Sequence, residues 1–246
     1  MTLALPRRAA AEFTGTALLV TAVVGSGIAA TTLSPTDVGL QLLENAFATA
    51  LALGALILTF GPVSGAHLNP VVSAVDWWLG RRAGTGLGTR ELAAYVIAQV
   101  AGAVAGTVLA HLMFDRPAVT WSGTGRSAGH LWLAEVVATA GLVILVFALA
   151  RSGRTSAAPA AVGAWIGAAY WFTSSTSFAN PAVTVGRAFT DTFAGIAPAS
   201  VPGFVAAQLV GGLVAVAALA IWYPHAADSA DDVVVPQRLT PEVEAR

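Results

Sequence analysis

Six apolar segments, each long enough to cross a lipid bilayer, constrain this chain more than any other feature. They cover residues 11–30, 41–60, 91–113, 131–150, 158–176 and 202–223. An α-helix of roughly 20 residues spans the hydrocarbon core of a bilayer. Only 10% of the residues are charged, whereas soluble domains are usually about 25% charged. The pattern therefore predicts an all-α membrane protein with six transmembrane helices.

Two further apolar pieces, Val71–Leu79 and Ala182–Phe189, are too short to cross a bilayer. Each follows an Asn-Pro pair, Asn69-Pro70 or Asn180-Pro181. Because Asn is a favoured helix N-cap and Pro is favoured at the first helical position, each pair predicts the start of a helix. One such pair is an ordinary turn signal. Two pairs at equivalent places predict two re-entrant half-helices.

The chain divides into two repeats, residues 11–113 and 131–223, each with three spans and one half-helix. An odd number of spans makes the repeats inverted in the membrane. Residues 1–10 then form a cytoplasmic N-terminus, and the polar tail 224–246 is expected to be cytoplasmic and disordered. Nine arginines fall on the side of the termini against three on the other, which favours two cytoplasmic termini.

Non-helical backbone is tolerated at membrane depth only inside protein or beside water. The stretches before the two Asn-Pro pairs would supply such backbone, and their carbonyls would form a polar ladder along a pore. The two helix starts bring positive partial charge to the midplane, where they would repel cations. The Asn amides could donate hydrogen bonds to a passing oxygen atom. The backbone residues expected to line this pore are Gly65, Ala66, His67, Leu68, Thr176 and Phe178.

Composition excludes several other functions. The chain has no Cys, and its four His residues lack metal-ligand spacing, so no metal site or cofactor is expected. A net charge of −1 without a basic stripe indicates no nucleic-acid partner. The predicted spans contain no pair of a nucleophile and a general base, so an enzyme is not expected. A secondary transporter with inverted repeats is an alternative, but its coupling acids would have to be Glu12, Glu44 or Glu135, none of which falls at the expected midplane.

Three stretches resemble signatures of the aquaporin, or major intrinsic protein, family: Ala11–Thr16, Ser64–Val71 and Ser177–Ala182. The similarity extends over roughly residues 9–223. It implies six tilted helices, two re-entrant half-helices, a pore in each protomer and a homotetramer in a bacterial-type inner membrane. Glu12 and Glu135 match the family's buried glutamates, which brace the re-entrant loops, and His67 matches a structural position. The family's pore motifs correspond here to Asn69, Pro70, Val71, Asn180, Pro181 and Ala182.

Two positions depart from the family pattern. Val71 stands where the family usually has Ala, and Val183 stands where it usually has a filter Arg. Counting back from the Asn residues without gaps, the resemblance implies a selectivity filter of Thr49, Ala168, Ser177 and Val183. Such a filter would be wide and uncharged.

The resemblance thus implies a passive channel for water, polyols, urea or metalloid hydroxides, embedded among membrane lipids. The alternative within the same fold is a metalloid or organoarsenical facilitator. Val183-Thr184 replaces the Arg-Asp pair of glycerol-conducting relatives, which argues against a dedicated glycerol facilitator.

Arg187 lies four residues after Val183 and therefore on the same helix face. Asp76 occupies the equivalent place after Asn69. Each could place charge in a pore vestibule, or could be a helix-end charge that meets a loop. The second interpretation is favoured for Asp76, and both remain open for Arg187.

Overall fold

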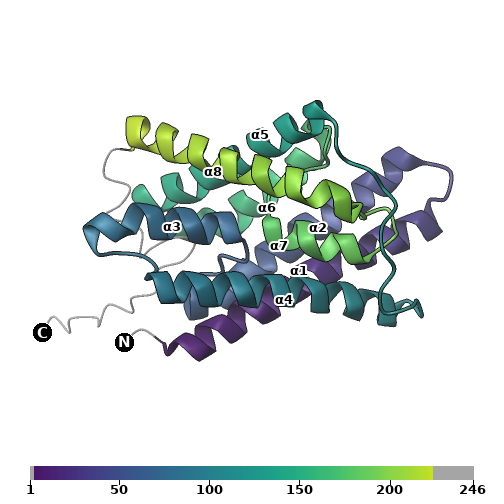
Figure 1. The fold of residues 1–246 in the computed structure, drawn as a ribbon, viewed down its shortest axis with the longest axis horizontal. Helices are drawn as coiled ribbons and strands as arrows, with labels where there is room; N and C mark the ends of the chain where they lie inside the picture. Colours follow the sequence, from purple (N-terminus) through teal and green to yellow (C-terminus); the bar gives the residue numbers. More distant parts are fainter. Residues whose placement is uncertain (1–2, 224–246) are drawn as a thin grey trace, which may run out of the picture.

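The computed structural model describes residues 3–223, which contain helices and no β-strand. Long helices run along the molecule, and the short helices α3 and α7 lie among them in opposite halves (Figure 1). The first half holds α1 Leu5–Leu33, α2 Val38–Ser64, α3 Pro70–Ala83 and α4 Thr89–Met113. The second half holds α5 Gly129–Arg151, α6 Ala158–Phe172, α7 Pro181–Gly186 and α8 Val201–Trp222, with 3-10 turns at Thr155–Ala157, Arg187–Phe189 and Pro198–Ser200.

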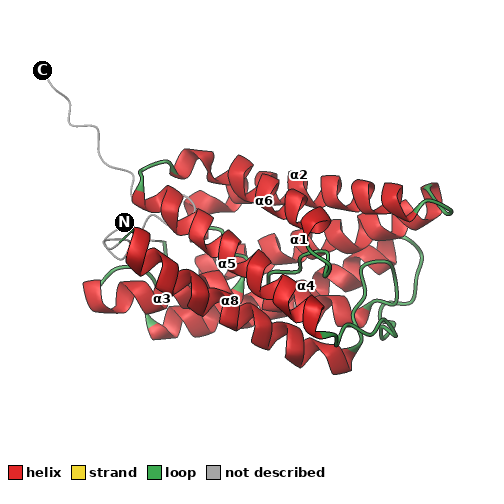
Figure 2. Ribbon diagram, turned by 90° about the horizontal axis from the view of Figure 1, so that it is seen from above, coloured by secondary structure: helices red, strands yellow, loops and turns green. Residues whose placement is uncertain are grey.

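The halves repeat the same packing. α1 packs on α4 and α2, while α5 packs on α8 and α6. The halves join where α2 meets α6, and each short helix crosses to the other half, α3 to α8 and α7 to α4. Figure 2 shows the helices arranged around the centre of the bundle, with loops at both ends. This cross-packing holds the starts of both short helices at the middle of the molecule.

Five helices among residues 3–223 are long and apolar enough to cross a membrane, namely α1, α2, α4, α5 and the stretch Pro198–Trp222 that contains α8. The remaining predicted span, 158–176, is shorter than expected. α6 ends at Phe172, and the hydroxyl-rich residues that follow leave the helix. Thr173 donates its hydroxyl hydrogen bond to Ala169 O at 2.6 Å, which illustrates how such side chains compete with helical bonding. α1, in contrast, begins six residues before the predicted segment.

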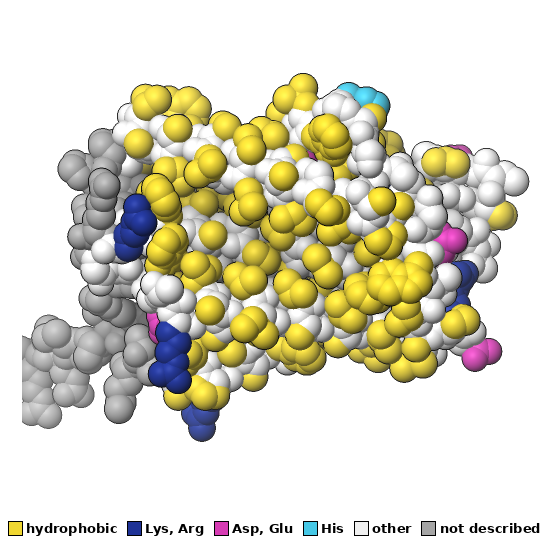
Figure 3. All heavy atoms as spheres, in the orientation of Figure 1, with side chains coloured by type: hydrophobic (Ala, Val, Ile, Leu, Met, Phe, Trp, Pro, Cys, Tyr) yellow, Lys and Arg dark blue, Asp and Glu magenta, His cyan; other side chains and the backbone are white. Residues whose placement is uncertain are grey.

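The outer surface is apolar between two charged ends. On the face in Figure 3, hydrophobic side chains cover the middle, whereas arginine and acidic side chains gather at the ends. Large apolar residues point outward even in mid-helix, as with Ile97 at 70% exposure and Leu213 at 61%. A soluble protein rarely leaves so large an apolar area uncovered. The belt is the surface that a helical membrane protein presents to lipid. The tail 224–246 lies outside the described residues.

Candidate functional site

The two short helices begin at the Asn residues of the Asn-Pro pairs, as expected. Asn69 Oδ1 accepts a hydrogen bond from Val71 N at 2.9 Å and caps α3. Asn180 Oδ1 accepts from Ala182 N at 3.0 Å and Val183 N at 3.3 Å and caps α7. In both helices proline occupies the first turn, where its missing N–H costs nothing.

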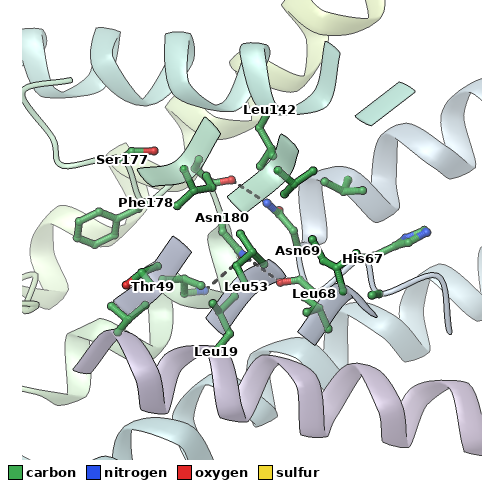
Figure 4. Close-up of a pocket in the computed structure, with 18 of the residues that line it drawn as sticks. Leu19, Thr49, Leu53, His67, Leu68, Asn69, Leu142, Ser177, Phe178 and Asn180 are labelled. Atoms are coloured by element: carbon green, nitrogen blue, oxygen red, sulfur yellow. Dashed lines mark hydrogen bonds between the residues drawn. The ribbon is translucent and has the colours of Figure 1, made fainter. Parts of the chain in front are cut away.

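The two Asn side chains also tie the loops to each other (Figure 4). Asn69 Nδ2 donates to Ala179 O at 2.8 Å, and Asn180 Nδ2 donates to Leu68 O at 2.7 Å. An amide nitrogen carries two N–H bonds, so each Asn retains one donor after this crossed contact. The caps and the crossed bonds together hold both amides beside the same space.

The loops before the caps contain strained backbone at equivalent places. Ala66 and Leu68 have φ of 47° and 48°, and Ser177 and Ala179 have φ of 47° and 49°. Residues other than glycine occupy this left-handed region at a cost of about 1–2 kcal/mol each. Such strain persists only where the surrounding structure over-determines it.

Two fully buried glutamates supply that restraint. Glu12 accepts hydrogen bonds from His67 N and Leu68 N at 3.0 and 2.7 Å, and also from Ser64 Oγ and Gln99 Nε2. Glu135 accepts the equivalent set. Its donors are Phe178 N at 2.9 Å, Ala179 N at 2.8 Å, Ser175 Oγ and Gln208 Nε2. Each carboxylate thus has four donors, which compensates for its burial.

A cavity of about 60 Å³ lies beside the crossed amides, enough for several water molecules. Its walls come from α1, α2, α5, α6, α3, α7 and both loops. Most of the lining is aliphatic, with a few hydroxyl, amide and backbone groups. A low-polarity wall with a narrow polar track suits a solute that keeps only some of its hydrogen bonds. The aliphatic residues contributed by α1, α2, α5 and α6 are Leu19, Val23, Leu53, Ile57, Leu142, Val146, Val162 and Ile166.

Most predicted pore residues line this cavity. They are Thr49, Ala66, His67, Leu68, Asn69, Ser177, Phe178, Asn180, Val183 and Arg187. Gly65, Thr176, Pro70, Val71, Pro181 and Ala182 lie just outside the lining, although all except Thr176 are buried. The His67 ring contacts Ser73 Oγ at 3.1 Å and packs edge-on to Tyr95, so this residue both lines the cavity and supports the loop.

The prediction for Ala168 is wrong. Ala168 is exposed on α6, and Tyr170 of the same helix lines the cavity instead. The cavity face of α6 is Val162, Ile166 and Tyr170, at intervals of four residues. Ala168 is two residues away from that series, about 200° around the helix. The Tyr170 hydroxyl lies 3.2 Å from Thr49 Oγ1, so these two residues form one part of the cavity wall.

Val71 points toward α8. A Cβ atom added to Gly212 would lie 2.7 Å from Val71 Cγ1. The glycine on α8 therefore accommodates the larger side chain, and the substitution of Val for Ala leaves the cavity lining unchanged.

The two charged positions differ in environment. Asp76 is buried and accepts a hydrogen bond from Leu87 N at 2.7 Å, so it fastens the loop after α3 and does not line the cavity. Arg187 lines the cavity, donates from Nε to Ala194 O, and places Cζ 3.4 Å from the centre of the Phe178 ring.

Sequence reasoning missed Arg126, in the loop between α4 and α5. It donates to Gly195 O at 3.0 Å and Ser175 O at 3.3 Å, and its Cζ lies 5.1 Å from the Phe178 ring. Burial lowers the pKa of Arg126 below its usual value, but a guanidinium stays charged at neutral pH. No sequence signal links this loop residue to the second Asn-Pro pair.

Comparison with known proteins identifies the family. The family model for major intrinsic proteins matches residues 1–177. The chain belongs to the major intrinsic protein family. Members of this family are channels, and this chain is a membrane channel with the aquaporin fold, not an enzyme.

Relatives of this family cover nearly the whole chain, including the second Asn-Pro pair beyond the family match. Aquaglyceroporin AqpS of Rhizobium meliloti is 54% identical over 213 residues, 87% of this chain and 88% of AqpS. A glycerol uptake facilitator protein of Pseudomonas aeruginosa is 32% identical, covering 78% of this chain and 77% of the facilitator. The X-ray structure of the aquaglyceroporin from Plasmodium falciparum shares the fold, with a TM-score of 0.64 over 90% of this chain and 98% of that one at 19% identity.

Proposed function

We propose that this major intrinsic protein conducts water and small uncharged, hydroxylated solutes through the cavity between its re-entrant loops. The observation that carries the proposal is the crossed pair of Asn amides. Each amide is fixed by a carbonyl of the other loop and keeps one N–H beside the cavity. Two fixed donors on one side of an apolar passage would orient a solute oxygen and interrupt a proton-conducting chain of waters.

The outer constriction favours solutes larger than water. In the place of the family's filter arginine it has Val183, together with Ser177 and the Thr49–Tyr170 wall. These four side chains are uncharged and leave room that an arginine would fill. The similarity to an aquaglyceroporin over 87% of the chain supports the same assignment. Polyols, urea and metalloid hydroxides all fit this description, and a metalloid facilitator is the alternative that differs only in its solute.

The assembly and its placement follow from the surface. The apolar belt and the arginines at the end that carries the described N-terminus support a channel domain over 11–223 in a bacterial inner membrane, with both termini cytoplasmic. The family resemblance supports a homotetramer with one pore in each protomer. Glu12 and Glu135 would act as braces and would not touch the solute.

Proteoliposomes with the full chain test the proposal. Stopped-flow light scattering is expected to show conductance for water and for at least one of glycerol, urea and arsenous acid, without saturation at high solute. Ile166→Trp, on the cavity wall, should block all of them. Ile221→Trp, at a position 76% exposed on the lipid-facing surface, serves as the matched control. Permeability equal to that of empty vesicles for every solute would refute the channel proposal, and saturable, gradient-driven uptake would indicate a transporter.

A further inference from the structure

The guanidinium of Arg187 is fixed at the cavity wall. The residue is only 2% exposed, its Nε donates to Ala194 O, and its Cζ lies over the Phe178 ring. Its own carbonyl accepts from Ile196 N at 3.2 Å. The Ala194 carbonyl and the Phe178 ring thus hold the side chain, and the Ile196 bond holds its backbone, one helical turn from Val183.

Arg187 forms no salt bridge with a described carboxylate, although the charge of Glu135 acts on it from a distance. The salt bridge between Arg8 and Glu91 joins α1 to α4 and does not involve Arg187. Glu135, on α5, is already occupied by four donors. No hydrogen bond from the terminal Nη groups of Arg187 occurs within the described chain. The Nη atoms do not belong to the buried polar atoms without a partner, so they reach the accessible space of the cavity and can bind whatever occupies it.

A hydroxyl group nearby also lacks a partner. Ser177 Oγ is buried, its residue is 2% exposed and lines the cavity, and no acceptor or donor within the described residues reaches it. Ser177 directly precedes Phe178, on whose ring the Arg187 guanidinium rests. An unpartnered hydroxyl and unpartnered guanidinium N–H groups therefore lie in the same part of the wall, as the close-up indicates for Ser177 and Phe178 (Figure 4).

Arg126 adds a second positive charge behind the same ring. It is held by Gly195 O and Ser175 O and does not line the cavity. Two guanidinium groups thus lie against one aromatic ring and place positive charge beside this part of the cavity wall. Charge lining a low-dielectric passage is weakly screened and acts strongly on ions that enter it.

We propose that Arg187 is the cationic guard of this channel, displaced by one turn from the filter position that Val183 occupies. Its Nη groups and Ser177 Oγ form a subsite that binds the oxygen atoms of a neutral hydroxylated solute and repels cations. Because the arginine is displaced, the passage at Val183 stays wide while Arg187 still repels cations. The inference rests on the proposed function, because it assumes that solute passes through this cavity.

The natural absence of cysteine offers a direct test with Arg187 intact. In Ser177→Cys, an anionic methanethiosulfonate (sulfonatoethyl) and a cationic one (aminoethyl) report the local potential. The measured quantity is the reaction rate of the anionic reagent divided by that of the cationic reagent. We expect this ratio to be at least about tenfold higher for the thiol at position 177 than for free 2-mercaptoethanol. A ratio equal to that of the free thiol, or no reaction with either reagent, would overturn the subsite.

Substitutions at Arg187 provide the second test. Arg187→Met removes the charge, and Arg187→Lys keeps it without the planar fork. With water permeability as the check on folding, Met should raise the leak of protons and Na⁺ at least about tenfold, and Lys should keep the leak low. Arg116→Gln, which removes an exposed arginine of the loop after α4, should change nothing.

The outcomes distinguish this inference from the proposed function. An Arg187→Met channel that still rejects cations as the unmodified protein does would overturn the guard while leaving the channel proposal intact. An equal loss of cation rejection in Arg187→Met and Arg187→Lys would indicate that Arg187 has a structural role, and would also overturn the guard. If neither variant folds, the thiol rate ratio at position 177 decides alone.

Discussion

At the scale of single residues, the filter depends on which side of a helix each residue occupies. Val183 and Arg187 are one turn apart on the same face, so the proposed filter position and a buried cation lie in one cavity wall. The sequence predicted this shared face because it depends only on helical spacing. It failed for Ala168, because counting back from Asn180 passes through a non-helical loop in which residue number no longer measures distance.

Val183→Arg should convert a wide constriction into a narrow one. The new guanidinium would project beside Thr49, Tyr170 and Ser177, and would add a second cation one turn from Arg187. We expect glycerol permeability to fall by about tenfold or more and water permeability to change by less than about threefold. Stopped-flow measurements on proteoliposomes that contain equal amounts of protein would determine both.

The control for this prediction separates size from charge. Val183→Leu adds volume without charge and should reduce glycerol permeability only partly. Unchanged ratios of glycerol to water permeability in both variants would show that the narrowest point lies elsewhere, and would contradict the placement of Val183 in the filter.

At the scale of helices, close crossings depend on glycine. A Cβ atom on Gly102 would lie 2.3 Å from Phe13 O, and one on Gly106 would lie 2.1 Å from Ala17 O. On the other half, a Cβ atom on Gly211 would lie 2.7 Å from Val136 O. The α1–α4 and α5–α8 pairs thus use the same device of small residues at the crossing.

Gly106→Ala should therefore destabilise the protein. The added methyl group would meet a backbone oxygen that moves only if α1 and α4 separate. Overpacking of this kind lowers the free energy of unfolding by about 1–3 kcal/mol. Because the neighbouring atom is a backbone oxygen, we expect a value near the upper end of this range. Gly129→Ala is the matched control, because Gly129 begins α5 and nothing lies within 4 Å of its Cβ position. Thermal unfolding measured in detergent should show a lower midpoint for Gly106→Ala and an unchanged one for Gly129→Ala. Equal midpoints for the two variants would contradict a close contact between α1 and α4 at Gly106.

Local chemistry explains which elements could be predicted from sequence. The helix starts at Asn69 and Asn180, and the six apolar segments, depend on neighbours within a few residues, so the sequence predicts them, although α6 ends at Phe172 and α1 begins at Leu5. The fit of Val71 against Gly212 joins positions 141 residues apart, and no local pattern carries that information.

At the scale of the whole molecule, the two halves are alike in the buried glutamates that hold the loops and differ in the charged residues after the short helices begin. Glu12 and Glu135 each collect the same four kinds of donor. The equivalent positions Asp76 and Arg187, however, carry opposite charges, one fixed to a loop and the other at the cavity. An inverted repeat with identical mouths would treat solute alike from both sides. The charge difference makes the orientation in the membrane functionally important.

Orientation can be measured because the chain contains no cysteine of its own. Ala118→Cys and Ser152→Cys place single thiols at exposed positions near opposite ends, and neither changes the arginine count that favours cytoplasmic termini. A membrane-impermeant maleimide should label Ala118→Cys on intact bacterial cells, and should label Ser152→Cys only after permeabilisation. The reverse pattern, or labelling of both in intact cells, would contradict the orientation. With Ala118 outside, Arg126 and Arg187 would lie on the periplasmic side of the crossed amides, so the proposed guard would meet entering cations first.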